Sequence, residues 1–250
     1  MQIEVVTLFP ELIRGALTVG VLGRAIERGI VSVGCEDPRA HTNDVHRTVD
    51  DRPYGGGPGM VLKPEPMSKA IDAAHARSPA GAPRVYMSAQ GAPFTQAMAE
   101  EFATLPGLVL VAGRYEGLDE RVIESRIDRE VSIGDYVLSG GEIPALCVID
   151  AVARLLPGVL GDDRSAVQDS FVKGLLDWPH YTRPVEHEGR KVPDVLQGGH
   201  HADIQRWRLK QAVARTWLRR PDLIARGGLP ADAAKLLDEF LAEREGEGHG

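Results

Sequence analysis

Two hydrophobic patterns alternate along the first 160 residues of the chain. Short aliphatic runs predict strands: Ile3–Leu8 opens the chain as one, and Leu108–Val111 is typical of a strand that is buried on both faces. Between them the spacing of apolar residues becomes helical: a helix is predicted to begin at Pro10, and another over Lys63–Arg77 has prolines in its first turn. Alternating strands and helices indicate an α/β domain.

Two later segments also have the spacing of helices. Glu142–Leu156 is apolar on nearly every side, so we expect it to be buried in a core or across a subunit interface. Ala233–Leu241 repeats apolar residues at positions i, i+3, i+4, i+7 and i+8, which predicts a last amphipathic helix that frays after Glu245. Between the two, Gly161–Gln168 is small, polar and aperiodic, as interdomain linkers often are.

Three predicted strand-to-loop junctions carry glycine beside a polar or aromatic residue: Tyr86–Gly91, Ala112–Gly117 and Ile133–Pro144. Glycine allows the backbone to approach a ligand closely, and in open α/β sheets ligands bind where such loops meet at one edge. The third junction is the most informative, because its glycines flank Tyr136 and Leu138, which suit a flat heteroaromatic ligand. Taken alone, it is also explained as a turn that caps a helix.

The glycine-rich segments do not match the known pyrophosphate-binding loops. No G-x-G-x-x-G sequence opens a helix, and Gly55–Met60 lacks the Lys-Ser/Thr ending of a P-loop. This argues against NAD, FAD and ATP as ligands.

Composition narrows the class of protein. With 250 residues, of which 43% are hydrophobic, the chain is long enough for one large and one small domain. No apolar run is long enough to span a membrane and the N-terminus has no secretory pattern, so we expect a cytoplasmic protein without membrane partners. Cys35 and Cys147 are expected to be free thiols, and the eight histidines show no metal-ligand spacing.

Charge is distributed unevenly. The net charge of −7 is unfavourable for a general nucleic-acid binder, but Arg206–Arg220 is strongly basic and contains no acidic residue, whereas the acids concentrate elsewhere, notably in Glu239–Glu247. A basic helix face beside an apolar one suits contact with an RNA backbone; a solvated helix face is the alternative. The candidate RNA-binding residues are Arg206, Arg208, Lys210, Arg215 and Arg219.

Several long motifs resemble those of the bacterial tRNA (guanine-N1)-methyltransferases, which belong to the SPOUT class. The resemblance runs from Leu8 almost to the C-terminus, and its motifs are His46–Met60, Gly113–Gly117, Ile133–Pro144, Asp169–Phe171, Pro179–Pro184 and Arg206–Lys210. It implies a SPOUT-type parallel sheet with flanking helices, tied in a trefoil knot, plus a small, mainly helical C-terminal domain. It also implies S-adenosylmethionine as cofactor, a requirement for Mg²⁺, and a homodimer whose active sites are shared between subunits.

With this resemblance, the predicted organisation has three parts. Residues 1–160 form the knotted catalytic domain that binds S-adenosylmethionine, 161–175 form a flexible interdomain linker, and 176–250 form a helical domain that binds tRNA. The implied reaction is methylation of N1 of guanine at tRNA position 37, in the anticodon stem-loop. The alternatives are a SPOUT methyltransferase that acts on another RNA base, and a non-catalytic RNA-binding protein that senses a nucleotide.

Methylation at N1 of guanine requires a base, because N1 carries a proton at neutral pH, and a donor for the charge that develops on O6. The resemblance assigns the base to Asp169, which alone is also explained as a helix N-cap. It assigns the donor to Arg154, since a guanidinium offers two parallel hydrogen bonds; an i,i+4 ion pair with Asp150 is the alternative.

The remaining site residues are assigned to the cofactor. Most of them shape the loops around adenine and ribose, whereas Glu116 and Asp177 are candidates for contacting the methionine amino group or the target base. The family usually has proline at the position of Ala89, and this difference removes no functional group. No ligand set for Mg²⁺ is assigned. The cofactor-binding candidates are Tyr86, Ser88, Gly113, Tyr115, Glu116, Ile133, Gly134, Asp135, Tyr136, Val137, Leu138, Gly140, Gly141, Pro144 and Asp177.

Overall fold

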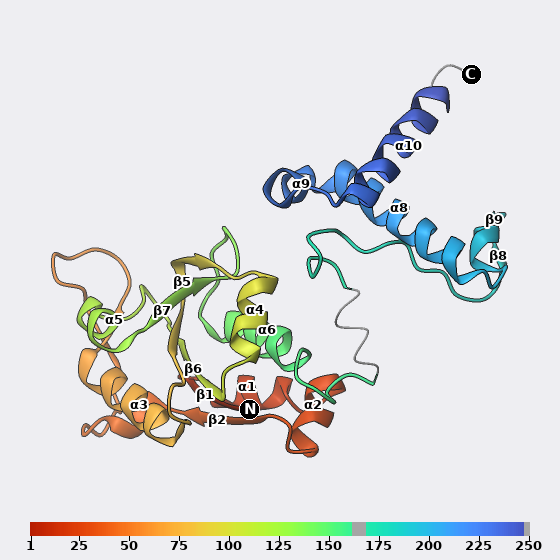
Figure 1. Ribbon diagram of the computed structural model, residues 1–250. Coiled ribbons are helices and arrows are strands. Elements are labelled where there is room, and N and C mark those ends of the chain that lie inside the picture. The colour runs from red at the N-terminus through yellow and green to blue at the C-terminus, as the bar shows by residue number, and fades with distance from the viewer. Residues whose placement is uncertain (162–168, 248–250) are drawn as a thin grey trace. The chain divides into compact units, whose positions relative to one another are not determined.

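The structure is a computed structural model that describes residues 1–161 and 169–247. The chain divides into two compact units, Met1–Asp163 and Arg164–Gly250 (Figure 1). Of the predicted linker, 162–168 lie outside the described residues, and 169–175 belong to the second unit.

A parallel five-stranded sheet forms the centre of the first unit. All four pairings between neighbouring strands are parallel, in the order β2-β1-β6-β5-β7. The fold is therefore mixed α/β, as predicted. The strands are β1 (Gln2–Val6), β2 (Ser32–Glu36), β5 (Arg84–Pro93), β6 (Gly107–Ala112) and β7 (Arg129–Ser132).

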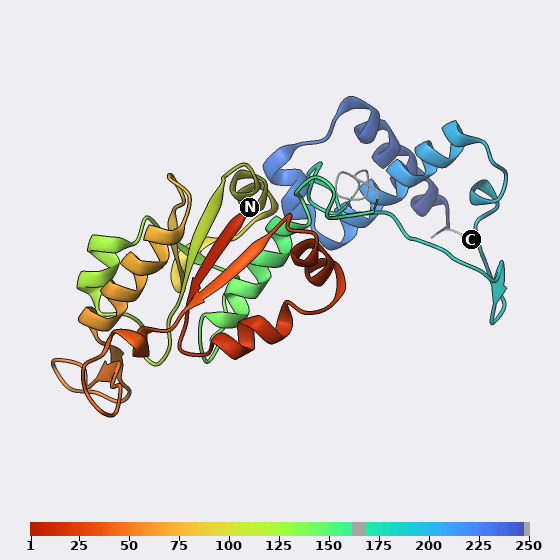
Figure 2. The same cartoon turned by 90° about the horizontal axis from the view of Figure 1, so that it is seen from below.

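Helices cover both faces of this sheet (Figure 2). One face carries α1 (Pro10–Ala16), α2 (Gly20–Glu27), α4 (Gln96–Ala103) and α6 (Glu142–Ala153), and the other carries α3 (Pro64–Arg77) and α5 (Glu120–Arg126). A 3-10 turn, η1 (Pro38–His41), follows β2, and a small antiparallel ribbon of β3 (Asp50–Asp51) and β4 (Val61–Leu62) precedes α3.

The aliphatic run of β6 shows why the strand is buried on both faces. Leu108 and Leu110 point into the core under α1, α2, α4 and α6, while Val109 and Val111 point into the core under α3 and α5. All four side chains are fully buried. An uninterrupted apolar run is what a strand between two helical layers requires.

The predicted helix at Pro10 and the one over Lys63–Arg77 are present as α1 and α3, but two other segments differ from expectation. Helix α6 ends at Ala153, not Leu156, because the chain tightens into i→i−3 hydrogen bonds at Leu155 and Leu156. In the single chain the helix is not buried on all sides, since Ile143 is 49% exposed and Cys147 is exposed, so burial of this side across a subunit interface stays a prediction.

The short strand predicted before Tyr86–Gly91 is longer in the structure. Strand β5 pairs with β7 up to Met87, loops out over 88–91, and resumes pairing at Ala92. A Cβ on Gly91 would lie 2.3 Å from the backbone nitrogen of Val131. The glycine therefore lets the returning chain pass directly against β7.

The second unit is mainly helical, as predicted. A hairpin of β8 (Glu186–His187) and β9 (Arg190–Lys191) and the 3-10 turn η2 (Asp194–Leu196) precede three helices, which are α8 (His201–Arg219), α9 (Pro221–Gly227) and α10 (Ala231–Glu247). Buried Thr216 of α8 accepts a hydrogen bond from the backbone N–H of Leu176 at 2.8 Å, and this bond ties the irregular segment before the hairpin to the helix.

No helix within the described part of the chain has the length and apolar character needed to cross a membrane. Both cysteines are free thiols, with Cys35 half-buried and Cys147 exposed.

Candidate active site

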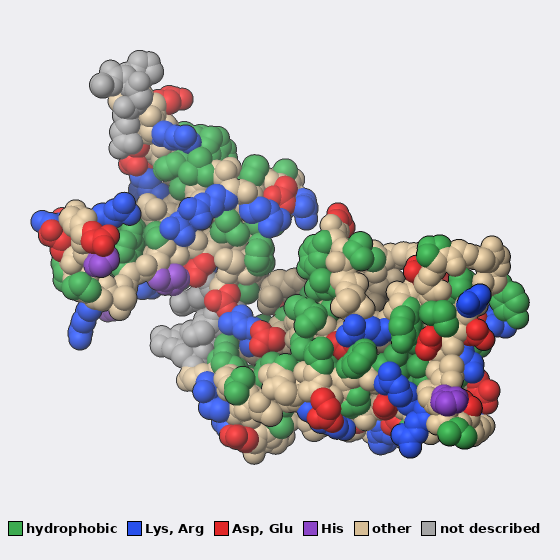
Figure 3. All heavy atoms as spheres, turned by 180° about the vertical axis from the view of Figure 1, so that it is seen from behind, with side chains coloured by type: hydrophobic (Ala, Val, Ile, Leu, Met, Phe, Trp, Pro, Cys, Tyr) green, Lys and Arg blue, Asp and Glu red, His purple; other side chains and the backbone are tan. Residues whose placement is uncertain are grey.

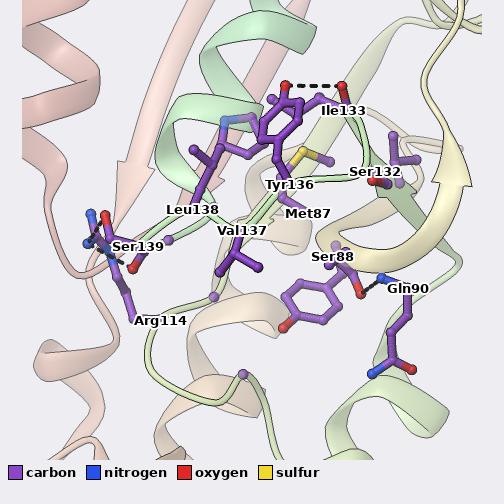
Figure 4. A pocket seen from close by; sticks show the side chains of 18 of the residues that line it. Met87, Ser88, Gln90, Arg114, Ser132, Ile133, Tyr136, Val137, Leu138 and Ser139 are labelled. Atoms are coloured by element: carbon purple, nitrogen blue, oxygen red, sulfur yellow. Dashed lines mark hydrogen bonds between the residues drawn. The ribbon is translucent and has the colours of Figure 1, made fainter.

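A cavity of about 350 Å³ opens in the first unit where the 88–91 loop of β5 meets the carboxyl ends of β6 and β7 (Figure 4). This volume is at the lower end of the range for small-molecule sites, about 300–1,000 Å³. Three loops line the cavity, and they are the three glycine-bearing junctions singled out in the sequence. The predicted residues on its lining are Tyr86, Ser88, Gly113, Tyr115, Glu116, Ile133, Gly134, Tyr136, Val137, Leu138, Gly140, Gly141 and Pro144.

The loop after β7 brings these walls together. It leaves the edge strand, passes the end of β5 and joins the loop after β6, where the N–H of Gly141 donates to the carbonyl of Gly113 at 2.9 Å. An antiparallel bridge pairs Arg114 with Gly140 beside this bond. The cavity is thus closed by backbone pairing between two loops that are separated by a whole strand and helix in the sequence.

Two of the glycines are required by close packing. A Cβ on Gly113 would lie 2.8 Å from the hydroxyl oxygen of Tyr86, and a Cβ on Gly141 would lie 2.7 Å from the Cα of Ala112. The second contact is with backbone, which has little freedom to yield. Glycine at these positions therefore allows the two loops to meet.

Tyr86 lies beneath the 113–117 loop and is only 6% exposed. Burial raises the pKa of its phenol, and a hydrogen bond with the backbone of Leu118 lowers that pKa in part. The hydroxyl is therefore protonated at neutral pH. Its ring forms part of the cavity floor and supports the loop above it.

Apolar side chains form the rim of the cavity. Tyr136, Val137 and Leu138 are 55%, 94% and 41% exposed, and the Tyr136 hydroxyl donates to the carbonyl of Ile133 at 3.2 Å (Figure 4). Gly134, at φ +144°, makes the sharp turn that brings the Tyr136 ring back over the loop. Exposed aromatic and aliphatic groups around a polar backbone suit a ligand with a flat ring.

An ion pair lies behind this rim. The Glu142 side chain is fully buried at the start of α6 and accepts from Arg114 Nε and Nη2, each at 2.8 Å. Arg114 Nη1 also donates to the carbonyl of Ser139 at 3.1 Å. In Figure 4, Arg114 and Ser139 lie on another side of the cavity from Ser88 and Gln90.

Sequence reasoning missed several lining residues. Except for Val131 and Ser132, which end strand β7, they lie inside the same three loops, so their positions carried a signal. They are Met87, Ala89, Gln90, Arg114, Gly117, Val131, Ser132 and Ser139.

Four of the residues predicted to be catalytic or to bind the cofactor do not line the cavity. Asp135 lies in the third loop, outside the lining. Arg154 directly follows α6 in the first unit, whereas Asp169 and Asp177 belong to the second unit. The carboxylate of Asp177 contacts His180 Nε2 at 2.7 Å and accepts from the N–H of Trp178 at 2.7 Å.

The basic helix is less open than its sequence indicates. The acids of α10, which were expected to lie elsewhere, pair with α8: Arg206 contacts Glu239 at 2.6 Å, and Lys210 contacts Glu243 at 2.5 Å. The prediction that these acids are remote from the basic residues is therefore wrong, because residues 33 positions apart meet where the two helices pack.

The other basic residues of α8 have different surroundings. The Arg208 guanidinium lies 5.0 Å from the centre of the Trp178 ring, and within the described part of the chain Arg215 and Arg219 form no ion pair. Trp217 of the same helix is 37% exposed. Figure 3 shows Lys and Arg side chains on the surface of the C-terminal unit with acidic ones between them.

Residues 1–161 and 169–247 contain no group of three histidine, cysteine, aspartate or glutamate side chains arranged to hold a metal ion.

Comparison with known proteins gives one consistent result. A family model described as tRNA (Guanine-1)-methyltransferase TrmD matches residues 1–226. The chain is 61% identical over 245 residues to a tRNA (guanine-N(1)-)-methyltransferase of Methylococcus capsulatus, with 98% of each chain covered. It is 55% identical to the protein of the same name from Cronobacter sakazakii, with 100% of this chain and 97% of that one covered. The protein of that name from Escherichia coli is 54% identical, with 100% and 98% covered.

Proposed function

Because the chain belongs to the tRNA (guanine-N1)-methyltransferase family, we propose that it transfers a methyl group from S-adenosylmethionine to N1 of guanine at position 37 of tRNA. The observation that carries this proposal is the cavity formed by the three glycine-bearing loops, which combines backbone hydrogen-bonding groups with the exposed rim of Tyr136, Val137 and Leu138.

The cavity suits S-adenosylmethionine by its chemistry. Adenine has two apolar faces and polar edges, and the rim offers apolar side chains beside the backbone of Ile133–Leu138. The cofactor, when bound, supplies an electrophilic methyl group on a sulfonium. Glu116 also lines the cavity, and its carboxylate is a candidate for contacting the methionine amino group.

Two residues are proposed to act on guanine. Asp169 accepts the N1 proton, which makes the N1 lone pair available for attack, and Arg154 donates hydrogen bonds to O6, where negative charge develops. Asp169 belongs to the second unit and Arg154 to the first. We also propose that the reacting site is completed when tRNA binds to a homodimer in which sites are shared between subunits.

The proposed homodimer is supported by the unpartnered stripe of α6. Ile143 and Cys147 are one turn apart on this helix, and both are exposed. The trefoil knot is also kept as a proposal. Its support is the passage of the loop after β7 across the end of β5 to Gly113.

We propose a separate role for each unit. The first unit holds the cofactor, and the second contacts the anticodon stem-loop through cations of α8, in particular half-buried Arg215 and exposed Arg219. A substrate of this kind fits a cytoplasmic enzyme.

We propose that methyl transfer requires Mg²⁺, but we assign no protein residues as its ligands. Because the described residues hold no group of three ligating side chains, they do not fit a resident metal ion, and no step of the proposed chemistry passes through one.

The test measures methyl transfer from labelled S-adenosylmethionine to a tRNA transcript with guanine at position 37, beside a transcript with adenine there. Wild-type protein should label only the first transcript. Asp169→Asn should lower kcat by about 100-fold or more, as the loss of a general base does, while Asp203→Asn, an exposed acid at the start of α8, should keep wild-type turnover.

The outcomes separate the rival functions. Label on both transcripts would point to a methyltransferase of the same class with another target base. Cofactor binding without any transfer would favour a nucleotide-sensing RNA-binding protein. Normal turnover by Asp169→Asn would keep the activity but remove Asp169 as the base.

A further inference from the structure

A buried polar network connects the cavity wall to the first strand of the sheet. The Glu142 carboxylate is fully buried, and its Oε1 accepts from the Thr7 hydroxyl at 2.8 Å. Its Oε2 accepts from Arg114 Nε and Nη2, each at 2.8 Å. The same Thr7 hydroxyl oxygen accepts from the N–H of Phe9 at 2.9 Å, so the chain leaving β1 is part of the network.

Glu142 is satisfied on both oxygens by these partners. A carboxylate without water around it is costly unless it is paired and hydrogen-bonded, and the Arg114 fork meets both conditions because its two donors lie in one plane. The carboxylate therefore holds the guanidinium in one orientation.

Arg114 transmits this orientation to the cavity. Its remaining Nη1 donates to the carbonyl of Ser139 at 3.1 Å, and its planar group lies 4.5 Å from the centre of the Phe9 ring. The side chain is only 19% exposed. A Cβ on Gly140 would lie 2.2 Å from Arg114 Nε, so the guanidinium and the 139–141 backbone are in direct contact.

We propose that Arg114 is a positioning residue for the cofactor. Fixed by Glu142, it sets the place of the Ser139–Gly141 backbone, which lines the cavity, and so determines cofactor affinity without touching the reacting atoms. This inference rests on the proposed function in one respect, namely that the ligand is S-adenosylmethionine.

The position requires arginine and not only a positive charge. Three donors of one planar group contact two places: Nε and Nη2 contact Oε2 of Glu142, and Nη1 contacts the carbonyl of Ser139. A lysine ammonium keeps the charge beside Glu142, so that carboxylate is not left unpaired, but a single nitrogen does not reach both sites in this geometry. Arg114→Lys therefore isolates the positioning role from the charge.

The experiment measures S-adenosylmethionine binding by calorimetry and steady-state methyl transfer to tRNA for the wild-type protein, Arg114→Lys and Glu142→Gln. Arg84→Lys is the matched control, because Arg84 also donates Nε and Nη2 to one carboxylate, that of Asp128, at 2.9 and 2.8 Å, is 24% exposed, and does not line the cavity.

Arg114→Lys should raise both the Kd and the KM for S-adenosylmethionine roughly 10- to 100-fold, as the loss of one or two charge-assisted hydrogen bonds predicts. Its kcat at saturating cofactor should stay within about twofold of wild type, because a positioning residue is not needed once the site is filled. Glu142→Gln should shift KM in the same direction, and Arg84→Lys should change neither constant.

Amide hydrogen exchange gives a second reading that does not depend on turnover. In Arg114→Lys the amides of 139–142 should exchange faster than in wild type, while those of β6 stay protected.

Three results would overturn the inference: wild-type KM in Arg114→Lys, a fall in kcat at unchanged KM, which would place Arg114 at the reacting atoms, or unchanged exchange over 139–142. Failure of the proposed function looks different, since the wild-type protein itself would then not bind S-adenosylmethionine.

Discussion

Replacing Gly141 with alanine tests whether the cavity depends on contact between its two backbone walls. Gly141 has φ −81° and ψ −4°, a conformation that alanine adopts without strain. The substitution is therefore purely steric: the added Cβ lies 2.7 Å from the Cα of Ala112 and 3.0 Å from the nitrogen of Gly113.

The cost follows from this geometry. To bring the Cβ to an ordinary contact of 3.4 Å, the start of α6 must move about 0.7 Å away from the end of β6. The hydrogen bond from Gly141 to Gly113, now 2.9 Å long, would then exceed the usual hydrogen-bond length. Overpacking costs about 1–3 kcal/mol and the lost hydrogen bond about 1 kcal/mol, so Gly141→Ala should destabilise the protein by about 2–4 kcal/mol.

Urea unfolding of the wild type and of Gly141→Ala measures this loss directly. Gly15→Ala is the control, because a Cβ there meets nothing within 4 Å, and alanine in α1 should stabilise by about 0.5–1 kcal/mol. Binding of S-adenosylmethionine should weaken only in Gly141→Ala. A free energy of unfolding within about 0.5 kcal/mol of wild type would refute the reasoning, since that is the size of an ordinary surface substitution.

Two further predictions concern charge. Burial raises the pKa of Glu36, but hydrogen bonds from His41 and Arg77 outweigh it, so the pKa lies below its usual value; the stability gained is present above the unfolded pKa, about 4.3, and is lost as pH falls through the folded pKa. Glu36→Gln should therefore destabilise at pH 7, and in urea unfolding the difference from wild type should shrink as pH falls below about 4.3. A difference that does not change with pH would contradict this. Glu239→Gln should release Arg206 from its ion pair and tighten tRNA binding. The slope of log K against log salt concentration should become steeper by the equivalent of about one phosphate contact. An unchanged slope would show that Arg206 does not contact phosphate.

The elements that the sequence predicts are those whose signal is local. The aliphatic run of β6 identifies a strand covered on both faces, and Pro10 identifies the start of α1. The three cavity loops are also found locally, because each combines glycine with a tyrosine a few residues away at the end of a predicted strand. The strand order is not predictable in this way, since β1 pairs with β6 across about a hundred residues of chain.

The errors have the same origin. Glu239 and Arg206 read as members of separate acidic and basic segments until α10 packs on α8 and pairs them. Likewise, the apolar pattern of α6 does not distinguish a side that faces the core from one, at Ile143, that is left exposed in the single chain. In both cases the sequence gives the chemistry of a side chain correctly, and the packing partner decides what that chemistry does.

Arg114 shows why part of the site escapes a reading of local motifs. It stands inside a motif that the sequence analysis singled out, yet its role depends on Glu142, 28 residues later, and through it on Thr7, which is 135 residues from Glu142 in the chain. Residues that face a ligand are constrained by the ligand's chemistry and share recognisable types. Residues that hold the wall in place are constrained only by each other, so they become visible when the fold brings them together. The cavity needs both kinds, because a loop rich in glycine has no stiffness of its own and takes its shape from the buried pair behind it.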